Sequence, residues 1–307
     1  MNLLIVGSVA IDTVETPSGI AERALGGSAT YASIAASYFA SPGIVGVVGN
    51  DFDKKHINLL KKMGVDLDGL QIDQSGKTFF WSGYYEGDMN QAHTRDTQLN
   101  VFEKFNPAIP DQYRDAPFVL LGNIHPALQL EVLKQVKRPQ LVLCDTMNYW
   151  ISSEPKLLEQ VFRKVDVICI NDGEACQFAG TTSLPAAAKQ LLKLGAKRVI
   201  IKKGAHGVLL FGKDSYFGLP ALPLLKVKDP TGAGDSFAGG VMGVMAKSRK
   251  IDENAFRKSL VAGTVMASYC VEDFSCRRTS RLNSSDLNKR AEQLKEAVRM
   301  PSFKLAK

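Results

Sequence analysis

The chain has 307 residues, of which 45% are hydrophobic and 22% charged, so it is not a disordered, collagen-like or small disulfide-stapled protein. This length suits two domains, or one large α/β domain with an insertion. The formal charge is +7, but residues 1–246 carry 24 basic and 24 acidic side chains, whereas residues 247–307 carry 14 and 7. Because the excess is confined to the last segment and no recognition-helix pattern accompanies it, we expect no nucleic-acid partner.

The cysteines form no Cys-x-x-Cys pair, which favours reduced thiols over disulfides or metal ligation. The apolar N-terminus lacks the basic flank and cleavage site of a signal peptide and is predicted to be a strand. No apolar run approaches the roughly 20 residues that span a bilayer. We therefore expect a cytoplasmic protein with no membrane partner. The cysteines are Cys144, Cys169, Cys176, Cys270 and Cys276.

Short β-branched runs alternate along the chain with segments of helical periodicity. Strand-like runs occur at residues 3–6, 44–48, 118–121, 141–144, 167–170, 199–201 and 208–211. Helical patterns occur at residues 28–39, 53–63, 127–136, 154–162, 174–179 and 184–194. Strands that are apolar on both faces and alternate with helices indicate a mostly parallel sheet covered on two sides. The predicted fold class is therefore α/β, with a three-layer α/β/α sandwich.

Residues 77–105 interrupt this alternation. Aromatic and β-branched residues lie on either side of a polar turn at residues 87–90, which predicts antiparallel strands. This small insertion is either an edge hairpin or a lid over a ligand cleft. Its aromatic residues Trp81, Tyr84 and Tyr85 either stack on a ligand or pack the strands together.

Residues 229–240 read Asp-Pro-Thr-Gly-Ala-Gly-Asp-Ser-Phe-Ala-Gly-Gly. Residues 230–234 predict a turn and residues 236–246 a helix of small side chains, so Gly232 and Gly234 lie at a helix N-terminus. Backbone N–H groups and the helix dipole bind anions at such a terminus. Asp235 either caps this helix or accepts a proton from a substrate hydroxyl that attacks phosphorus.

Rival patterns are absent from the sequence. It contains no Gly-x-x-x-x-Gly-Lys-Ser/Thr loop, and no Gly-x-Gly-x-x-Gly follows a strand to mark a dinucleotide-binding fold. The four histidines are scattered and indicate no metal cluster. A hydride-transfer function therefore loses its main support.

Residues 229–240 resemble the C-terminal signature of the ribokinase or PfkB-type carbohydrate kinases, and further matches span nearly the whole chain. They are a first strand ending in an aspartate (residues 7–12), a Gly-Gly hinge before a helix (25–29), an Asn-x-x-Glu element (171–174) and a Gly-x-x-Gly loop (203–207). The resemblance implies one ribokinase-like kinase domain over residues 1–307, with a small antiparallel β lid at about residues 13–24 and 77–105. It also implies ATP and Mg²⁺ as cofactors.

The resemblance assigns roles to individual residues around the reaction. Asp235 would be the catalytic base, and the N–H groups of Gly232, Ala233 and Gly234 would bind the transferred phosphoryl group. Glu174 and Asn171 would organise Mg²⁺, mainly through water. The nucleotide would contact Thr231, Lys203, Gly204, Gly207 and Asn171.

The acceptor would be held by a second group of residues, which are Asp12, Gly26, Gly27 and Ser28. Asp229 and Thr231 match positions at which some members bind a monovalent cation such as K⁺. Relatives commonly pair through exposed lid strands, so the resemblance also allows a homodimer formed through the lid.

Each motif also has a purely structural interpretation. Asp12 alone is typical of a turn at a strand end, and Glu174 alone of the first turn of a helix. Gly204 and Gly207 alone fit a hairpin turn between two apolar strands. The order of the motifs along one chain is what favours the joint interpretation.

Two departures from the family pattern bear on the acceptor. Many sugar-kinase relatives have an asparagine four residues after the second hinge glycine, where this chain has Tyr31. The family often shows Asp-x-Asn after the strand at residues 141–144, but here Asn148 follows Asp145 one place later. The loss of an amide at Tyr31 argues against a simple ribokinase, and the shift of Asn148 implies that its contacts differ from those in the family.

The sequence therefore predicts an ATP-dependent kinase that phosphorylates a hydroxyl of a sugar or a sugar-containing small molecule. The first alternative is a nucleoside kinase of the same fold, with aromatic lid residues stacking on the base. The second is a non-catalytic sugar- or nucleotide-binding regulator. The intact sequence from Gly232 to Asp235 argues against the second, because a binding module needs no base there.

Overall fold

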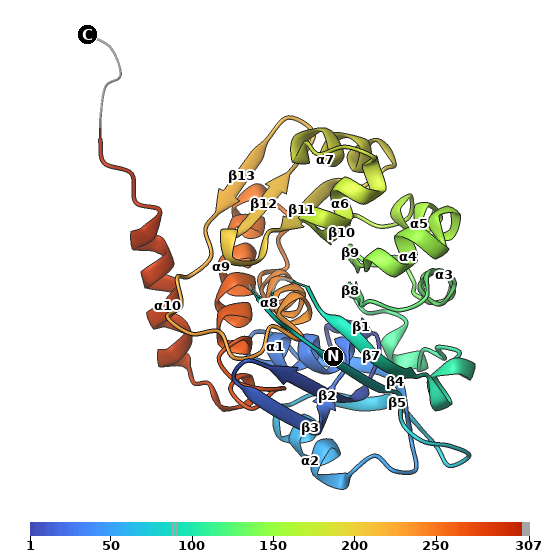
Figure 1. Ribbon diagram of the computed structural model, residues 1–307. Coiled ribbons are helices and arrows are strands. Elements are labelled where there is room, and N and C mark those ends of the chain that lie inside the picture. The colour runs from blue at the N-terminus through green and yellow to red at the C-terminus, as the bar shows by residue number, and fades with distance from the viewer. Residues whose placement is uncertain (88, 90, 303–307) are drawn as a thin grey trace.

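The structure is a computed structural model that describes all residues except 88, 90 and 303–307. Its centre is a nine-stranded sheet with the strand order β13-β12-β11-β10-β9-β8-β1-β4-β5 (Figure 1). Neighbouring strands are parallel except for the antiparallel pairs β11–β12 and β12–β13. The strands are β1 (Leu3–Val6), β4 (Pro42–Gly49), β5 (Asp66–Asp73), β8 (Phe118–Leu121), β9 (Leu141–Asp145), β10 (Val167–Asn171), β11 (Arg198–Lys202), β12 (Val208–Phe211) and β13 (Tyr216–Leu219).

Helices cover both faces of this sheet, which confirms the predicted three-layer α/β/α sandwich. Successive residues of a strand point to opposite faces, so Leu3 and Ile5 belong to one core cluster and Leu4 and Val6 to the other. One layer contains α1 (Ser28–Ser37), α2 (Lys54–Lys62), α8 (Ala233–Ser248) and α9 (Glu253–Cys270), with α10 (Ser284–Ala297) packed outside them. The other contains α3 (Pro126–Gln135), α4 (Asn148–Ser153), α5 (Pro155–Phe162), α6 (Asp172–Ala179) and α7 (Leu184–Lys193).

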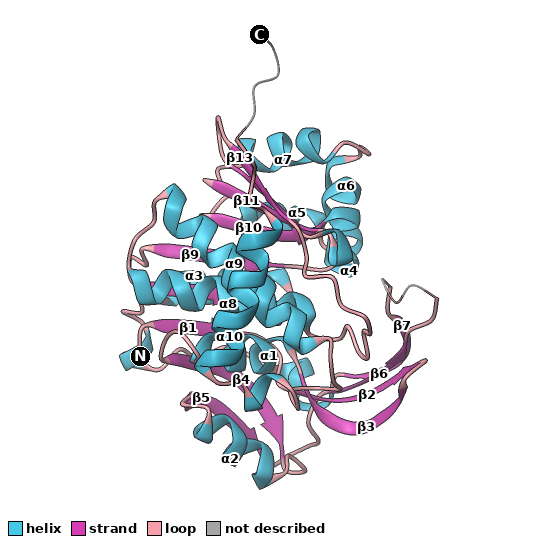
Figure 2. Cartoon of the chain, turned by 90° about the vertical axis from the view of Figure 1, so that its left-hand side faces the viewer, coloured by secondary structure: helices cyan, strands magenta, loops and turns pink. Residues whose placement is uncertain are grey.

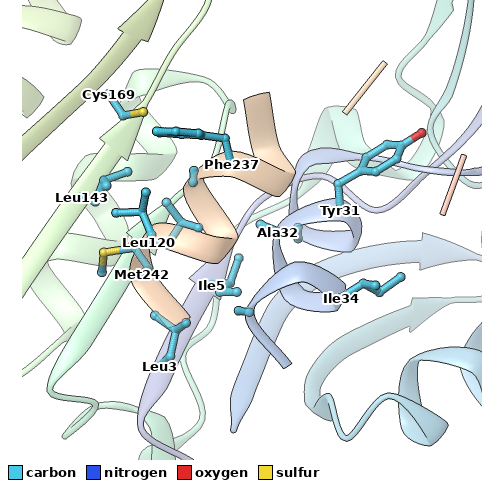
Figure 3. Packing of buried hydrophobic residues seen from close by; sticks show 14 of the residues in the cluster. Leu3, Ile5, Tyr31, Ala32, Ile34, Leu120, Leu143, Cys169, Phe237 and Met242 are labelled. Atoms are coloured by element: carbon cyan, nitrogen blue, oxygen red, sulfur yellow. The ribbon is translucent and has the colours of Figure 1, made fainter. Parts of the chain in front are cut away.

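Small residues let α8 lie close to both α1 and α9. A Cβ added to Gly239 would overlap the carbonyl oxygen of Ala32 in α1, and one added to Gly240 would lie 2.9 Å from the carbonyl oxygen of Ala262 in α9. Figure 3 shows Phe237 of α8 between α1 and the strands of the sheet. This packing fixes the axis of α8, and therefore the place of its N-terminus.

A second, four-stranded sheet stands beside the large one, as Figure 2 shows. It consists of β2 (Ala10–Thr16), β3 (Gly19–Gly26), β6 (Phe80–Tyr84) and β7 (His93–Gln98), in the order β3-β2-β6-β7. The hairpins β2–β3 and β6–β7 are antiparallel, as predicted, and their inner strands β2 and β6 run parallel. Trp81 Nε1 donates to Thr94 Oγ1 at 3.2 Å, and Tyr84 stacks on His93, so these two aromatic side chains contact the neighbouring strand.

Among the described residues there are also four short 3-10 turns: η1 (Asn100–Lys104), η2 (Asp111–Tyr113), η3 (Gly204–His206) and η4 (Thr279–Arg281). Buried side chains of η1 and η2, including Val101 and Tyr113, join the core beneath β4 and β8. Within the described ranges, no helix combines the length and the apolar character needed to cross a bilayer.

Candidate active site

The strand order sets apart the neighbouring strands β1 and β8. After β1 the chain adds β4 and β5 on one side, and the later strands are added on the other, so β1 and β8 mark a topological switch point. In open α/β sheets, ligands bind outside the carboxyl ends of the strands at such a point. Gly7 and Gly122 follow β1 and β8, and both lie against Ser28 at the start of α1.

The four residues predicted to hold the acceptor lie together beside this switch point. Ser28 Oγ accepts from the backbone N–H of Ser8 at 3.1 Å, and Ser8 Oγ accepts from that of Ser28 at 3.0 Å. Gly27 has a φ of 93°, and a Cβ on it would lie 2.8 Å from the backbone nitrogen of Ala10. A Cβ on Gly26 would overlap the carboxyl group of Asp12. The hinge glycines thus allow α1 to start directly against β2.

Asp12 is a buried acid at this hinge, with 5% of its surface exposed. Burial raises its pKa to about 8, assisted by the negative charges of Asp229 and Asp235 and opposed by the N–H of Gly27. Its carboxyl group can therefore exchange a proton near neutral pH when a ligand brings hydroxyl groups to it.

The segment predicted to bind phosphate forms the first turn of α8. Gly232 is the N-cap residue, in the left-handed conformation with a φ of 76°, and it has no side chain to cap the turn. The alternative that Asp235 is the N-cap is wrong, because Asp235 lies within the helix. The N–H of Ala233 donates within the turn to the carbonyl oxygen of Pro230 at 3.1 Å. The first-turn N–H of Gly234 and the positive end of the helix dipole favour an anion at this end of α8.

Asp235 lies among charged groups from the sheet. Burial, together with the negative charge of Asp145, raises its pKa to about 7 against the opposing effect of Lys202. A carboxylate with a pKa near 7 holds a proton more strongly than an ordinary aspartate and can still be ionised at neutral pH. These are the properties of a general base.

Asp145 and Lys202 belong to this site although the sequence interpretation did not place them there. Lys202 Nζ lies 2.9 Å from each carboxylate oxygen of Asp145. Burial alone would lower the pKa of Lys202, but Asp145 and other acidic neighbours raise it above its usual value. The signal was the register: the two residues end strands on either side of β10, on the face covered by α8. Lys203 follows β11, and its backbone N–H donates to the carbonyl oxygen of Gly207.

Asn171 and Glu174 form a reciprocal cap at the start of α6. Asn171 Oδ1 accepts from the backbone N–H of Glu174 at 2.7 Å, and Glu174 Oε2 accepts from that of Asn171 at 2.9 Å. Burial raises the pKa of Glu174 to about 7. In the part of the chain that the structure describes, no three His, Cys, Asp or Glu side chains form a group that could hold a metal. This donor set fits Mg²⁺ bound through water and substrate phosphates, and not a cage built of protein ligands.

Asp229 and Thr231 lie just before the anion-binding turn. Asp229 is 1% exposed, and its carboxylate accepts from the backbone N–H groups of Thr231 at 2.9 Å and Ser275 at 3.4 Å. Burial raises its pKa. The hydroxyl of Thr231 lies 3.2 Å from that of Tyr85, which follows β6. The small sheet thus touches the segment that leads into α8.

Gly204 and Gly207 flank the turn η3 between the antiparallel strands β11 and β12, so the hairpin interpretation of these glycines is confirmed. Gly207 has a φ of 90°, and a Cβ on it would overlap the carbonyl oxygen of Leu219 in β13. Strand packing therefore explains Gly207, and contact of either glycine with a nucleotide stays a prediction.

A three-layer α/β/α fold with an acid in the first turn of a helix that has a glycine N-cap fits a phosphotransferase, and comparison with known proteins identifies an ATP-dependent one. The pfkB family carbohydrate kinase pattern matches residues 2–282, and the chain belongs to this family. It is 32% identical over 260 residues to the cytidine kinase of Thermococcus kodakarensis, covering 82% of this chain and 91% of that protein.

Solved structures share the fold. The nucleoside kinase of Methanocaldococcus jannaschii, an archaeal member of the ribokinase family, is 20% identical with a TM-score of 0.76, covering 95% of this chain and 99% of that chain. Ribokinase from Giardia lamblia is 16% identical with a TM-score of 0.80, covering 95% and 98%. The family match and the similarity to a cytidine kinase make the chain an ATP-dependent sugar or nucleoside kinase. This conclusion rules out the alternative of a non-catalytic regulator.

Proposed function

We propose that Asp235 is the base of a kinase that transfers the γ-phosphate of ATP to a hydroxyl of the sugar part of a small acceptor. The observation that carries the proposal is the position of Asp235. It lies in the first turn of α8, next to an N-cap that is a glycine, and its charge acts on the buried Asp12 of the acceptor hinge. In this proposal one carboxyl group serves both the helix end that would bind phosphate and the hinge that would bind the acceptor hydroxyl.

In this reaction the acceptor hydroxyl gives its proton to Asp235 as its oxygen forms a bond to the γ-phosphorus and the bond to ADP breaks. The N–H groups of Gly232, Ala233 and Gly234 stabilise the charge on the phosphoryl oxygens during transfer. Mg²⁺, when bound with ATP, neutralises phosphate charge, and Glu174 with Asn171 would hold its water ligands. Asp12, Gly26, Gly27 and Ser28 orient the acceptor.

A nucleoside acceptor is favoured by an aromatic cluster near the switch point. Trp150 of α4 donates from Nε1 to Asn123 Oδ1 at 3.0 Å, just after β8, and its ring meets those of His125 and Tyr149 edge-on. Trp150 is partly exposed and Tyr149 is 58% exposed. A fixed, accessible indole at the carboxyl ends of β8 and β9 suits a planar base. The similarity to a cytidine kinase points the same way.

We further propose that the small sheet, with segments at about residues 13–24 and 77–105, closes over the acceptor within a single kinase domain over residues 1–307. Thr231, Lys203, Gly204 and Gly207 would then contact ATP, and Asp229 would bind K⁺. Strand β7 is exposed along most of its length, which suits pairing with a second copy through the lid. The free cysteines suit the reducing cytoplasm.

The test measures ADP formation with ATP, Mg²⁺ and a panel of free sugars, phosphosugars and nucleosides. We expect turnover with nucleosides, and a loss of at least tenfold in kcat/KM for them in Trp150→Leu. Tyr216→Leu, which alters an exposed aromatic residue in β13, is the control. Turnover only with free sugars would overturn the nucleoside proposal and leave the kinase assignment in place. No turnover with any acceptor would count against the role of Asp235.

A further inference from the structure

Lys202 reaches from the end of β11, across β10, to the end of β9. Adjacent strands lie about 5 Å apart, so the side chains of Lys202 and Asp145 together bridge about 10 Å of sheet beneath α8. Only 17% of the side chain is exposed, and its partner Asp145 is 5% exposed. A long cationic side chain is costly to order and bury, so its position calls for a reason.

Its ammonium group has a donor left over. An ammonium carries three N–H donors, and within the described residues the structure accounts for two, one on each oxygen of Asp145 at 2.9 Å. The same nitrogen lies 3.2 Å from the point at which Gly234 would carry a Cβ. Lys202 therefore borders the anion-binding turn of α8 directly.

The glycine at position 234 independently supports an open space beside the ammonium group of Lys202. Unlike Gly232, it has no positive φ, so its backbone conformation does not require glycine. Glycine within a helix is less favourable than alanine. A methyl group here would press on the ammonium group of Lys202, so the glycine keeps open the space between the lysine and the helix end.

Lys202 brings a positive charge to this space, since its ammonium group pairs with Asp145 and lies 3.2 Å from the Cβ position of Gly234. The same charge opposes the rise in the pKa of Asp235. A phosphoryl group arriving at the end of α8 adds further negative charge. A cation beside it is the arrangement that stabilises charge on phosphoryl oxygens.

We propose that Lys202 binds the transferred phosphoryl group at the N-terminus of α8 and is a catalytic residue of this kinase. It donates a hydrogen bond to a non-bridging phosphoryl oxygen and keeps its own protons. Meanwhile the bond from γ-phosphorus to ADP breaks, the bond to the acceptor oxygen forms and the hydroxyl proton passes to Asp235. Asp145 is a positioning residue that holds the ammonium group in place. The inference rests on the proposed function of Asp235.

The test compares Lys202→Met with the wild-type kinase and with Lys197→Met. Lys197 lies just before the opposite end of β11 and pairs with Asp166 at 2.7 Å, so its loss should leave kcat within about twofold. Lys202→Met should lower kcat by about 10²- to 10³-fold, with less than tenfold change in the KM of the acceptor. Lys202→Arg, which keeps the charge with another shape, should recover part of the loss.

The double variant Lys202→Met/Asp145→Leu removes both charges of the buried pair. It distinguishes the proposed catalytic role of Lys202 from a merely structural one. If Lys202 only neutralises Asp145, the double variant regains wild-type kcat and the proposal is overturned. If Lys202 binds the phosphoryl group, kcat stays low although the thermal unfolding temperature recovers. Binding of ADP with aluminium fluoride, measured by calorimetry, should weaken at least tenfold in the double variant, and unchanged binding would also overturn the proposal. Because wild-type turnover is measured alongside, failure of this inference is distinct from failure of the kinase assignment.

Discussion

The ring of Tyr31 lies against the α-carbon of Gly232, so closely that a Cβ on Gly232 would overlap it. Tyr31 belongs to α1, which starts at the acceptor hinge, and it is 3% exposed. Gly232 is the N-cap of α8. One buried contact therefore joins the hinge to the N-terminus of α8. Tyr31 stands at the position where the family resemblance places an asparagine in many sugar kinases.

This contact predicts the behaviour of Gly232→Ala. The left-handed conformation costs an alanine about 1–2 kcal/mol, and the methyl group must also displace the ring. We expect a fall in melting temperature and a loss of at least 10²-fold in kcat, measured by thermal unfolding and steady-state kinetics. Gly64→Ala is a matched control, because Gly64 has the same φ of 76° and nothing within 4 Å of its Cβ position. Equal effects in both variants would show that the ring contact has no role.

Asp235→Asn keeps the shape of the side chain and removes the base. We expect turnover to fall by several orders of magnitude while ATP binding, measured by calorimetry, persists. The wild-type enzyme should also show a pH dependence, because the base must be ionised. With the pKa of Asp235 raised to about 7, kcat/KM for the acceptor should rise about tenfold per pH unit below 7 and level off above it. Near-normal activity of Asp235→Asn would contradict the mechanism.

Asp12→Asn should weaken acceptor binding and raise the melting temperature at high pH. The pKa of Asp12 is about 8 in the folded protein, against about 4 for an exposed aspartate, so between these values the folded state binds a proton that the unfolded state does not. Wild-type stability is therefore lost as pH rises through this window, and the uncharged amide avoids the loss. We expect the variant to melt several degrees above wild type at pH 8, with little difference at pH 4, and to raise the KM of the acceptor at least tenfold. The exposed Asp214→Asn is the control, and a melting difference independent of pH would refute the burial argument.

The predictable parts of the fold are those whose residues carry a strong local pattern. Strands such as β10 are apolar on both faces, and the turn before α8 is rich in glycine, so both were visible in the sequence. Strand β5 was not predicted. It lies at an edge of the sheet, where burial is partial, and its sequence Asp-Leu-Asp-Gly-Leu-Gln-Ile-Asp is polar at every second or third position.

The candidate site likewise contains residues that could be predicted from the sequence and residues that could not. The motif residues Asp12, Gly26 and Asp235 could be identified from the family resemblance. Lys202 and Asp145 are 57 positions apart and meet only because β9 and β11 flank β10, so their pairing depends on strand order and register. The available signal was a charged residue at the end of an apolar strand. The family resemblance assigned the neighbouring Lys203, and not Lys202, to the site.

Two hydrogen bonds hold the small sheet to the segment that leads into α8. Thr16 Oγ1 donates to the carbonyl oxygen of Lys228 at 2.8 Å, and the hydroxyl groups of Tyr85 and Thr231 lie 3.2 Å apart. Removing both in Thr16→Val/Tyr85→Phe should destabilise the closed position of the lid and admit water to the γ-phosphate. We expect the ratio of acceptor phosphorylation to total ATP consumption to fall, because ATP hydrolysis rises.

The control for this prediction is Thr94→Val, which removes a hydroxyl that bonds Trp81 inside the small sheet and leaves the contacts with residues 228–231 intact. Its coupling ratio should equal that of the wild-type enzyme, measured as product formed per ADP released with and without acceptor. If Thr16→Val/Tyr85→Phe couples as tightly as the control, the two hydrogen bonds do not govern closure. Water exclusion would then depend on the acceptor itself, whose binding between Asp12 and Asp235 fills the space through which water would reach the phosphate.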